Sequence, residues 1–216
     1  TGGNNSGRPR SNQFRNRAPK KKMVSPLKPE QLVKEASGKE VVEYKSERTF
    51  DSLPISDKLK ACLKAKGYER PSEIQDKSLE YLLDKRDILG IAETGTGKTA
   101  AFLIPIIEDL QIHRKKSFAL ILLPTRELAM QVEDEFKSMT KGMGLYSASY
   151  IGGTNINTDL KNARRDSNIV IATPGRLLDL VQRRAINLSR FNTLILDEFD
   201  RMLDMGFVKD MKQIIA

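Results

Sequence analysis

The sequence has 216 residues, of which 39% are hydrophobic, and a formal net charge of +9 at pH 7. This length fits one domain of about 150–200 residues and a tail, and no apolar run approaches the roughly 20 residues of a membrane span. Cys62 is the only cysteine and His113 the only histidine, which excludes internal disulfides and Cys- or His-cluster metal sites and disfavours a Ser-His-Asp hydrolase. The N-terminus shows no apolar stretch behind its charges, so we expect a cytoplasmic protein.

The positive charge is concentrated at the N-terminus. Residues 1–29 contain eight Lys and Arg residues, no acidic residue, and Phe14 as the only aromatic residue, so the rest of the chain is nearly neutral. Such a segment cannot bury enough apolar surface to offset its ordering entropy, and we predict a disordered basic tail. The tail either holds nucleic acid by neutralising phosphates or serves as a solubilising linker. Residues 30–48 are predicted to form a linker, with a short helix at 29–36.

From Phe50 onward, helical and strand-length patterns follow one another. Two helices are predicted first, at 56–66 and 72–84. Strands are predicted at 87–92, 118–123, 147–151, 168–172 and 193–196, with helices at 98–112, 126–140, 155–164 and 175–183. Several strands are continuously apolar, as expected for strands buried on both faces. The alternation predicts an α/β domain over residues 49–216, with a parallel sheet, helices on both faces and ligands at the carboxyl ends of the strands.

The first predicted strand leads into a phosphate-binding pattern, Ala92-Glu93-Thr94-Gly95-Thr96-Gly97-Lys98-Thr99, in which Ala92 holds a position that is often Gly. Gly95 and Gly97 allow the backbone N–H groups to point inward at phosphate oxygens, and the next helix offers its positive end to the same anion. Lys98 can reach the outer phosphates, and the Thr99 hydroxyl can bind Mg²⁺.

The last predicted strand leads into Asp197-Glu198-Phe199-Asp200. An acid at the tip of a buried strand can bind Mg²⁺ through water, and a second acid can deprotonate the attacking water in phosphoryl transfer. Because Leu194-Ile195-Leu196 precedes these acids, a merely solvated turn is the weaker interpretation.

Further motifs resemble one family, the DEAD-box RNA helicases. Phe50 lies 17 residues before Gly67, and the segment Gly67-Tyr68-Glu69-Arg70-Pro71-Ser72-Glu73-Ile74-Gln75 resembles the family's Q motif. Three RNA-backbone motifs have counterparts in order: Pro124-Thr125-Arg126-Glu127-Leu128-Ala129, Gly152-Gly153 and Thr173-Pro174-Gly175-Arg176. Asp197–Asp200 takes the place of the name-giving tetrad. The resemblance covers roughly residues 50–210 and implies a RecA-like P-loop fold.

The resemblance also implies roles for individual residues. Gln75 would read the adenine edge, with Phe50 and Tyr68 packing near the base, which implies ATP rather than GTP as the nucleotide. Lys98 and Thr99 would hold phosphates and Mg²⁺, with Asp197 as a further Mg²⁺ contact through water. Glu198 would be the general base, and Asp200 would link the site to a later Ser-Ala-Thr motif.

The implied partner is single-stranded RNA, bound through phosphates and sugars without regard to base sequence. The residues implied in this contact are Pro124, Thr125, Arg126, Gly152, Gly153, Thr173, Gly175 and Arg176. Arg126 and Arg176 each follow a predicted strand and open a helix, so a cation and backbone N–H groups converge on one phosphate. The expected form is a monomer with a second RecA-like domain in the same full-length chain.

Two features depart from the family pattern. Phe199 replaces the usual Ala, and overpacking beside the nucleotide typically costs about 1–3 kcal/mol unless the neighbouring side chains are smaller. The sequence begins with Thr and stops at Ala216, so we expect a fragment with an incomplete sheet that lacks the Ser-Ala-Thr strand and the second domain. Both features keep open an ATP-dependent RNA clamp or scaffold with little turnover. A phosphate-loop metabolic kinase leaves the RNA motifs unexplained.

Other candidates have simpler interpretations. Met202, Met205 and Met211 are predicted to be core or exposed surface, and Cys62 a buried core residue. His113 is predicted to be an exposed charge at a helix C-terminus. Lys161, Arg164 and Arg165 are predicted to form a solvated helix face, with RNA contact as the alternative.

Overall fold

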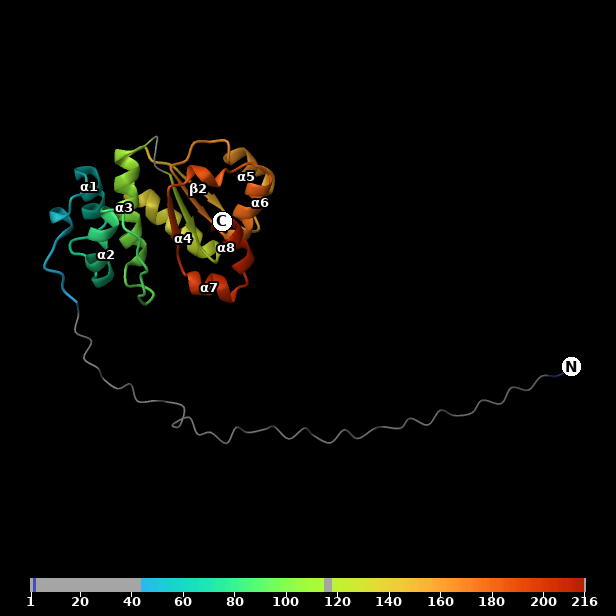
Figure 1. Ribbon diagram of the computed structural model, residues 1–216, viewed down its shortest axis with the longest axis horizontal. Coiled ribbons are helices and arrows are strands. Elements are labelled where there is room, and N and C mark those ends of the chain that lie inside the picture. Colours follow the sequence, from blue (N-terminus) through green and yellow to red (C-terminus); the bar gives the residue numbers. More distant parts are fainter. Residues whose placement is uncertain (1, 3–43, 115–117, 216) are drawn as a thin grey trace, which may run out of the picture. The chain divides into compact units, whose positions relative to one another are not determined.

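The computed structural model describes Gly2 and residues 44–114 and 118–215 (Figure 1). The predicted tail, apart from Gly2, and the short helix at 29–36 lie outside the described residues. The chain divides into two units, Thr1–Val42 and Glu43–Ala216.

The second unit alternates helices and strands after two leading helices. A short 3-10 turn, Phe50–Ser52, precedes α1 (Asp57–Ala65), α2 (Glu73–Leu83) and α3 (Lys98–Ile112). The order continues as β1 (Ala119–Leu122), α4 (Arg126–Met139), β2 (Ser147–Tyr150), α5 (Ile156–Asn162), β3 (Ile169–Ala172) and α6 (Pro174–Gln182). A 3-10 turn, Leu188–Arg190, then leads to β4 (Thr193–Leu196), α7 (Phe199–Asp204) and α8 (Val208–Ile215). The predicted helices and four of the five predicted strands are confirmed within a few residues.

The four strands form one parallel sheet in the order β2-β3-β1-β4. The register places Leu120 opposite both Val170 and Leu194, so the carboxyl ends of the three strands β3, β1 and β4 lie level. Because every strand runs the same way, the loops that follow them meet along one edge. This confirms the α/β class and fixes where the site residues can gather.

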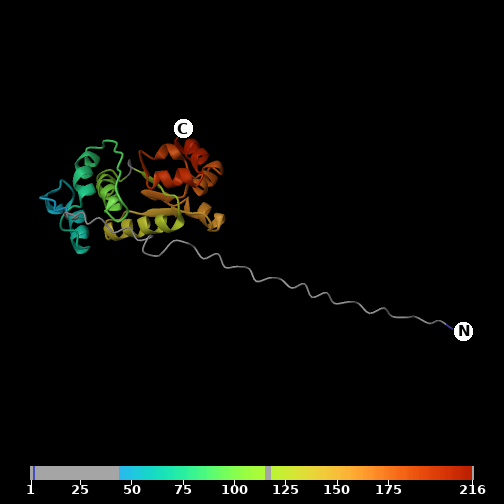
Figure 2. The same cartoon turned by 90° about the horizontal axis from the view of Figure 1, so that it is seen from below.

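Alternate strand residues pack into two hydrophobic cores, one on each face of the sheet. Ile121 and Ile171 face a core that includes Leu59 of α1, Leu103 of α3 and Phe136 of α4. The other core combines strand residues with α6, α7 and α8, through Leu120, Val170, Leu177, Met202 and Met211. Figure 2 shows α4 on the opposite side of the sheet from α7 and α8. Helices therefore cover both faces, as predicted.

The predicted strand at 87–92 is wrong. These residues have no strand structure, and Leu89 and Ile91 are 88% and 89% exposed. Within the described residues β4 pairs with β1 alone, and Leu194 of β4 is also exposed. An extended segment forms a strand only if a neighbour pairs with its backbone N–H and C=O groups, and no described strand does so here.

The structure also places the single histidine, the single cysteine and the three methionines discussed above. His113 is exposed at the end of α3, while Cys62 is only partly buried against the core rather than fully buried. Met202 and Met211 are core residues and Met205 is exposed. Within the described ranges, no helix is long and apolar enough to cross a membrane.

Candidate functional site

The phosphate-binding loop is folded around its own lysine. Gly95 and Gly97 have φ of 82° and 95°, a region that glycine adopts without a steric penalty. The Lys98 Nζ donates to the carbonyl oxygens of Ala92 and Glu93, at 3.1 Å for Glu93, and the Thr96 hydroxyl donates to Glu93 O at 2.8 Å. Lys98 also begins the 15-residue helix α3, so a cation and a helix N-terminus lie at the same loop.

Gln75 and Ser72 connect α2 to this loop. The Gln75 Nε2 donates to Gly97 O at 3.0 Å, and the Ser72 hydroxyl donates to Thr96 O at 2.7 Å. The Ser72 N–H donates to the Gln75 Oε1 at 2.9 Å, and Gln75 is only 3% exposed. Gln75 therefore faces the loop. Sequence reasoning missed the part of Ser72, although a Ser followed three residues later by Gln is a known helix-start pattern.

Phe50 and Tyr68 lie together at the start of the same region. Their rings meet edge to face at 5.7 Å and 77°, and the Phe50 N–H donates to Glu69 O at 3.2 Å. Phe50 is buried in the core. Burial and the nearby Glu135, which accepts from the Tyr68 hydroxyl at 3.1 Å, raise the pKa of Tyr68 to about 12. Tyr68 is therefore a neutral hydroxyl at physiological pH.

The acidic motif begins where β4 ends. The Asp197 N–H donates to Leu122 O at 3.0 Å, and the Asp197 carboxylate accepts from the Glu198 N–H at 3.1 Å. Burial raises the pKa of Asp197, against the lowering effects of that hydrogen bond and of Lys98. Glu198 has φ of 50° and pairs with Arg201 at 3.0 Å. Sequence reasoning missed this partner of the predicted base.

Two residues of the phosphate-binding loop and the acidic motif line one cavity of about 760 Å³, whose other lining residues are mostly apolar and belong to α2, α3, β4 and residues 88–91. Ala92, Lys98, Asp197 and Glu198 are among its lining residues. Carboxylate and hydroxyl oxygens such as those of Asp197 and Thr99 are ligands that Mg²⁺ accepts, and Mg²⁺ in proteins is often held by one or two side chains together with phosphates and water. This chemistry fits the predicted metal. The described residues contain no group of three or more His, Cys, Asp or Glu side chains that could enclose a metal by themselves.

Phe199 does not overpack the site. The residue also lines the cavity and is 41% exposed, so its ring is accommodated without displacing neighbours. Phe199 is the third residue of the acidic motif and the first residue of α7, and with this exposure the cost expected for overpacking does not arise in this structure.

A second group of predicted site residues lies at the carboxyl ends of β1, β3 and β2. Thr125 caps α4 by accepting from the Leu128 N–H at 3.3 Å, and the Thr173 N–H donates to Tyr150 O at 3.0 Å. Gly153 has φ of 82°, and a Cβ there would lie 2.6 Å from the Nη1 of Arg126. Arg126 is exposed and lies directly over this glycine, so the loops after β1 and β2 meet.

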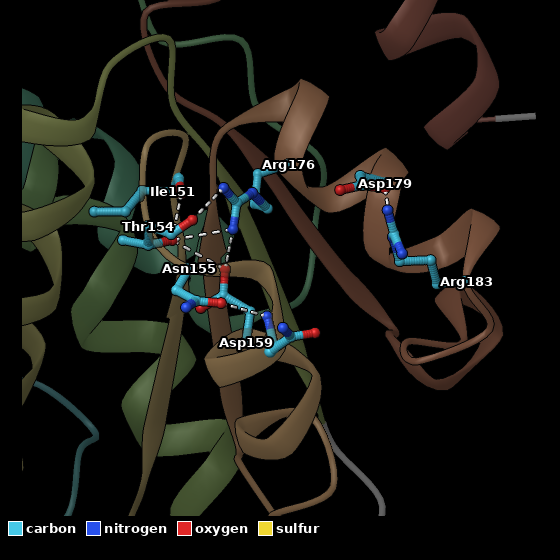
Figure 3. Close-up of polar contacts among 8 residues, drawn as sticks. Ile151, Thr154, Asn155, Asp159, Arg176, Asp179 and Arg183 are labelled. Atoms are coloured by element: carbon cyan, nitrogen blue, oxygen red, sulfur yellow. Dashed lines mark hydrogen bonds and ion pairs between the residues drawn. The ribbon is translucent and has the colours of Figure 1, made fainter.

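Arg176 turns inward from this group (Figure 3). Its guanidinium forms an ion pair with Asp159 and donates to Thr154 Oγ1 at 3.1 Å and Thr154 O at 2.8 Å. The Thr154 hydroxyl in turn donates to Ile151 O at 2.9 Å. The side chains of Arg176 and Asp159 are 11% and 7% exposed. Arg176 therefore braces the turn that carries Gly152 and Gly153, a contact that its motif alone did not indicate.

The basic residues of α5 and the following turn are exposed, unlike the Arg176 side chain. Lys161, Arg164 and Arg165 are all exposed, as predicted for a solvated face.

The family profile of the DEAD/DEAH box helicases matches residues 72–216. The chain belongs to this family. Among curated proteins, the ATP-dependent RNA helicase DeaD of Buchnera aphidicola subsp. Acyrthosiphon pisum (strain APS) is 43% identical over 171 residues, which are 79% of this chain and 28% of that protein. The DeaD protein of Escherichia coli (strain K12) is 42% identical over 171 residues, 79% of this chain and 27% of that protein. The chain thus spans less than a third of the length of these relatives.

Two crystal structures share the fold of this DEAD-box chain. One is of a DEAD box protein from the hyperthermophile Methanococcus jannaschii, with a TM-score of 0.72 and 43% identity over 77% of this chain and 46% of that one. The other is of a hypothetical ATP-dependent RNA helicase from Sulfolobus tokodaii, with a TM-score of 0.70 and 36% identity over 75% of this chain and 47% of that one. These similarities confirm the RecA-like P-loop fold predicted from the motifs.

Proposed function

We propose that residues 49–216 are the ATP-binding domain of an RNA helicase that couples ATP hydrolysis to local unwinding or remodelling of RNA. The observation that supports this most directly is the meeting of Lys98 and Asp197 at one cavity. The turns at Arg126 and Gly153 lie along the same carboxyl edge of the sheet, which gives a bound RNA strand a route past the nucleotide.

In the proposed nucleotide site, the loop from Ala92 to Thr99 holds the phosphates. Lys98 exchanges the carbonyl oxygens of Ala92 and Glu93 for phosphate oxygens. Thr99 and Asp197 hold Mg²⁺, directly or through water. When bound, Mg²⁺ neutralises charge on the phosphates. Gln75 reads the adenine edge while keeping α2 against the loop, and Phe50 and Tyr68 pack near the base.

For hydrolysis, Glu198 is the proposed general base. Its carboxylate pairs with Arg201 in this structure, so it must leave Arg201 to orient and deprotonate the attacking water. Asp200, on the first turn of α7, is proposed to couple this site to the rest of the protein.

The proposed RNA contact uses backbone N–H groups and cations at three neighbouring strand ends. Arg126 is exposed and ready to meet a phosphate, whereas Arg176 holds the Gly152–Gly153 turn in shape through Asp159. The remaining predicted contacts belong to the same turns, where Gly175 is exposed, Thr125 is partly buried, and Pro124 and Thr173 are buried. Contacts of this kind read phosphates and sugars and are indifferent to base sequence.

We further propose that the domain acts in the cytoplasm, within a monomer whose second RecA-like domain supplies additional cations. In comparable phosphoryl transfer such cations contribute about 10³–10⁵ in rate. The 216-residue chain alone should therefore show little RNA-stimulated ATPase activity, measured by phosphate release. Robust stimulation of its ATPase activity by RNA would contradict the proposal that catalysis needs cations from a second domain.

Substitution of the proposed base tests the reaction. In the whole protein, Glu198→Gln should leave ATP binding intact and abolish hydrolysis, while Gln75→Ala should relax the preference for ATP over GTP. Hydrolysis that survives Glu198→Gln removes Glu198 as the base. ATP binding with negligible turnover in the unsubstituted whole protein supports the clamp alternative.

The basic tail has a separate test. Deletion of residues 1–29 should lower RNA affinity and flatten its dependence on salt, because fewer phosphates are neutralised. An unchanged salt slope identifies the tail as a linker.

A further inference from the structure

Residues 44–48 run along α2 without regular secondary structure, yet they are closely held. Ser46 is buried, although neither a helix nor a strand contains it. The Arg70 Nη1 donates to Ser46 O at 2.7 Å, and the Arg48 N–H donates to the Ser46 hydroxyl oxygen at 3.0 Å. This segment precedes the motifs that resemble the family, so their sequence pattern does not account for it.

One carboxylate of α2, that of Asp76, interacts with three residues of this segment. Asp76 Oδ2 accepts from the Tyr44 hydroxyl at 2.6 Å and from the Ser46 hydroxyl at 2.7 Å, and Asp76 Oδ1 lies 3.9 Å from the Arg48 Nε. Arg48 also pairs at 3.1 Å with Glu80, one turn further along α2. We call Tyr44, Ser46, Arg48 and Asp76 the clasp.

The Asp76 carboxylate is suited to this role. The Tyr44 and Ser46 hydroxyls and the charge of Arg48 lower the pKa of Asp76, against a raising effect of burial, so it is ionised at neutral pH. Two short hydrogen bonds to an ionised acceptor are stronger than bonds between neutral groups. The clasp therefore restrains an otherwise irregular segment.

The clasp adjoins both parts of the proposed adenine site. Phe50, which meets the Tyr68 ring, follows Arg48 by two residues. Gln75, which bonds to Gly97 O, directly precedes Asp76. The Asp76 carboxylate thus connects the irregular segment that leads to Phe50 with the helix that contains Gln75.

We infer that Asp76 is a positioning residue for adenine recognition, which holds Phe50 and Gln75 at a fixed separation through the clasp. This inference rests on the proposed ATP-binding function. It predicts that opening the clasp weakens recognition of the base and leaves phosphate binding intact, because Asp76 accepts from Tyr44 and Ser46, whereas the Lys98 Nζ donates to Ala92 O and Glu93 O within the loop.

The test compares Asp76→Asn with Glu133→Gln in the 216-residue chain. Glu133 is a matched control, because its side chain is 16% exposed against 15% for Asp76, and it likewise accepts from a serine, Ser147, and pairs with a cation, Lys137. Affinities for ATP, GTP and inorganic triphosphate are measured by titration calorimetry with Mg²⁺ present. Tyr44→Phe, which removes one hydrogen bond, serves as a milder second variant.

We expect Asp76→Asn to weaken ATP binding about tenfold, the effect of one lost charge-assisted hydrogen bond, with a narrower ATP-to-GTP ratio and unchanged triphosphate affinity. Tyr44→Phe should move the same ratio by a smaller factor, and Glu133→Gln should leave it unchanged. If Asp76→Asn does not fold, the result for Tyr44→Phe decides.

If the wild-type chain prefers ATP and both clasp variants keep the same ratio of ATP to GTP affinity, this inference is overturned and the proposed function remains in place. Equal loss of ATP and triphosphate affinity also overturns it, since that is the result of general destabilisation. A wild-type chain that binds ATP and GTP equally overturns the adenine assignment and this inference with it.

Discussion

Gly97→Ala should reveal how tightly α2 is held against the phosphate-binding loop. Gly97 has φ of 95°, and a Cβ there would lie 2.5 Å from the Gln75 Nε2 and 2.9 Å from the Ser72 Oγ. The left-handed conformation costs a residue with a side chain about 1–2 kcal/mol. Displacing Gln75 and Ser72 also loses their hydrogen bonds to the loop, each contributing about 1 kcal/mol. We expect a loss of about 3–4 kcal/mol in the free energy of unfolding.

Gly95→Ala is the matched control for this substitution. Gly95 has φ of 82°, but a Cβ there meets nothing within 4 Å, so only the conformational cost of about 1–2 kcal/mol applies. Both variants are compared by urea denaturation followed by circular dichroism, without nucleotide. Equal losses for the two variants would show that Gln75 and Ser72 do not hold the loop as described.

Charged and aromatic side chains around the site lead to further expectations. Asp197→Asn should raise the Tm, because burial disfavours the carboxylate that Asn replaces, and an unchanged Tm would contradict this. Arg176→Met should lower the free energy of unfolding in urea by about 3–5 kcal/mol, because it leaves Asp159 buried without its cation. Adding Asp159→Asn to this variant should recover part of the lost stability. Phe199→Ala should cost about 1 kcal/mol or less, since the ring is half exposed, and a core-sized loss would refute its placement. The stability advantage of wild type over Asp76→Asn should disappear as pH falls through the lowered pKa of Asp76, because a carboxyl whose pKa is lower in the folded state stabilises only while ionised; a difference that persists in acid would refute this.

Local patterns predicted most helices of the domain well. The stretch from Lys98 to Ile112 is predicted and observed with the same bounds, because Gly97 permits the turn before it and the apolar residues after it are buried in the core. Thr125 likewise marks the start of α4 by capping it. Such signals depend on residues only a few positions apart.

Features that depend on distant partners could not be predicted in this way. Residues 87–92 have an apolar strand pattern, but no described strand pairs with them, and residues 87–91 remain exposed. Arg176 has the motif of a phosphate contact, yet its partner in this structure is Asp159 on another helix. A periodic pattern records a preference for burial, whereas pairing depends on which groups the whole fold brings together.

The central claim, that the cavity between Lys98 and Asp197 holds ATP with Mg²⁺, is tested most directly by titration calorimetry of the chain with ATP. We predict saturable one-site binding that requires Mg²⁺ for full affinity, favours ATP over GTP and is strongly weakened by Lys98→Ala. Absence of binding, or the same affinity in Lys98→Ala, would contradict it.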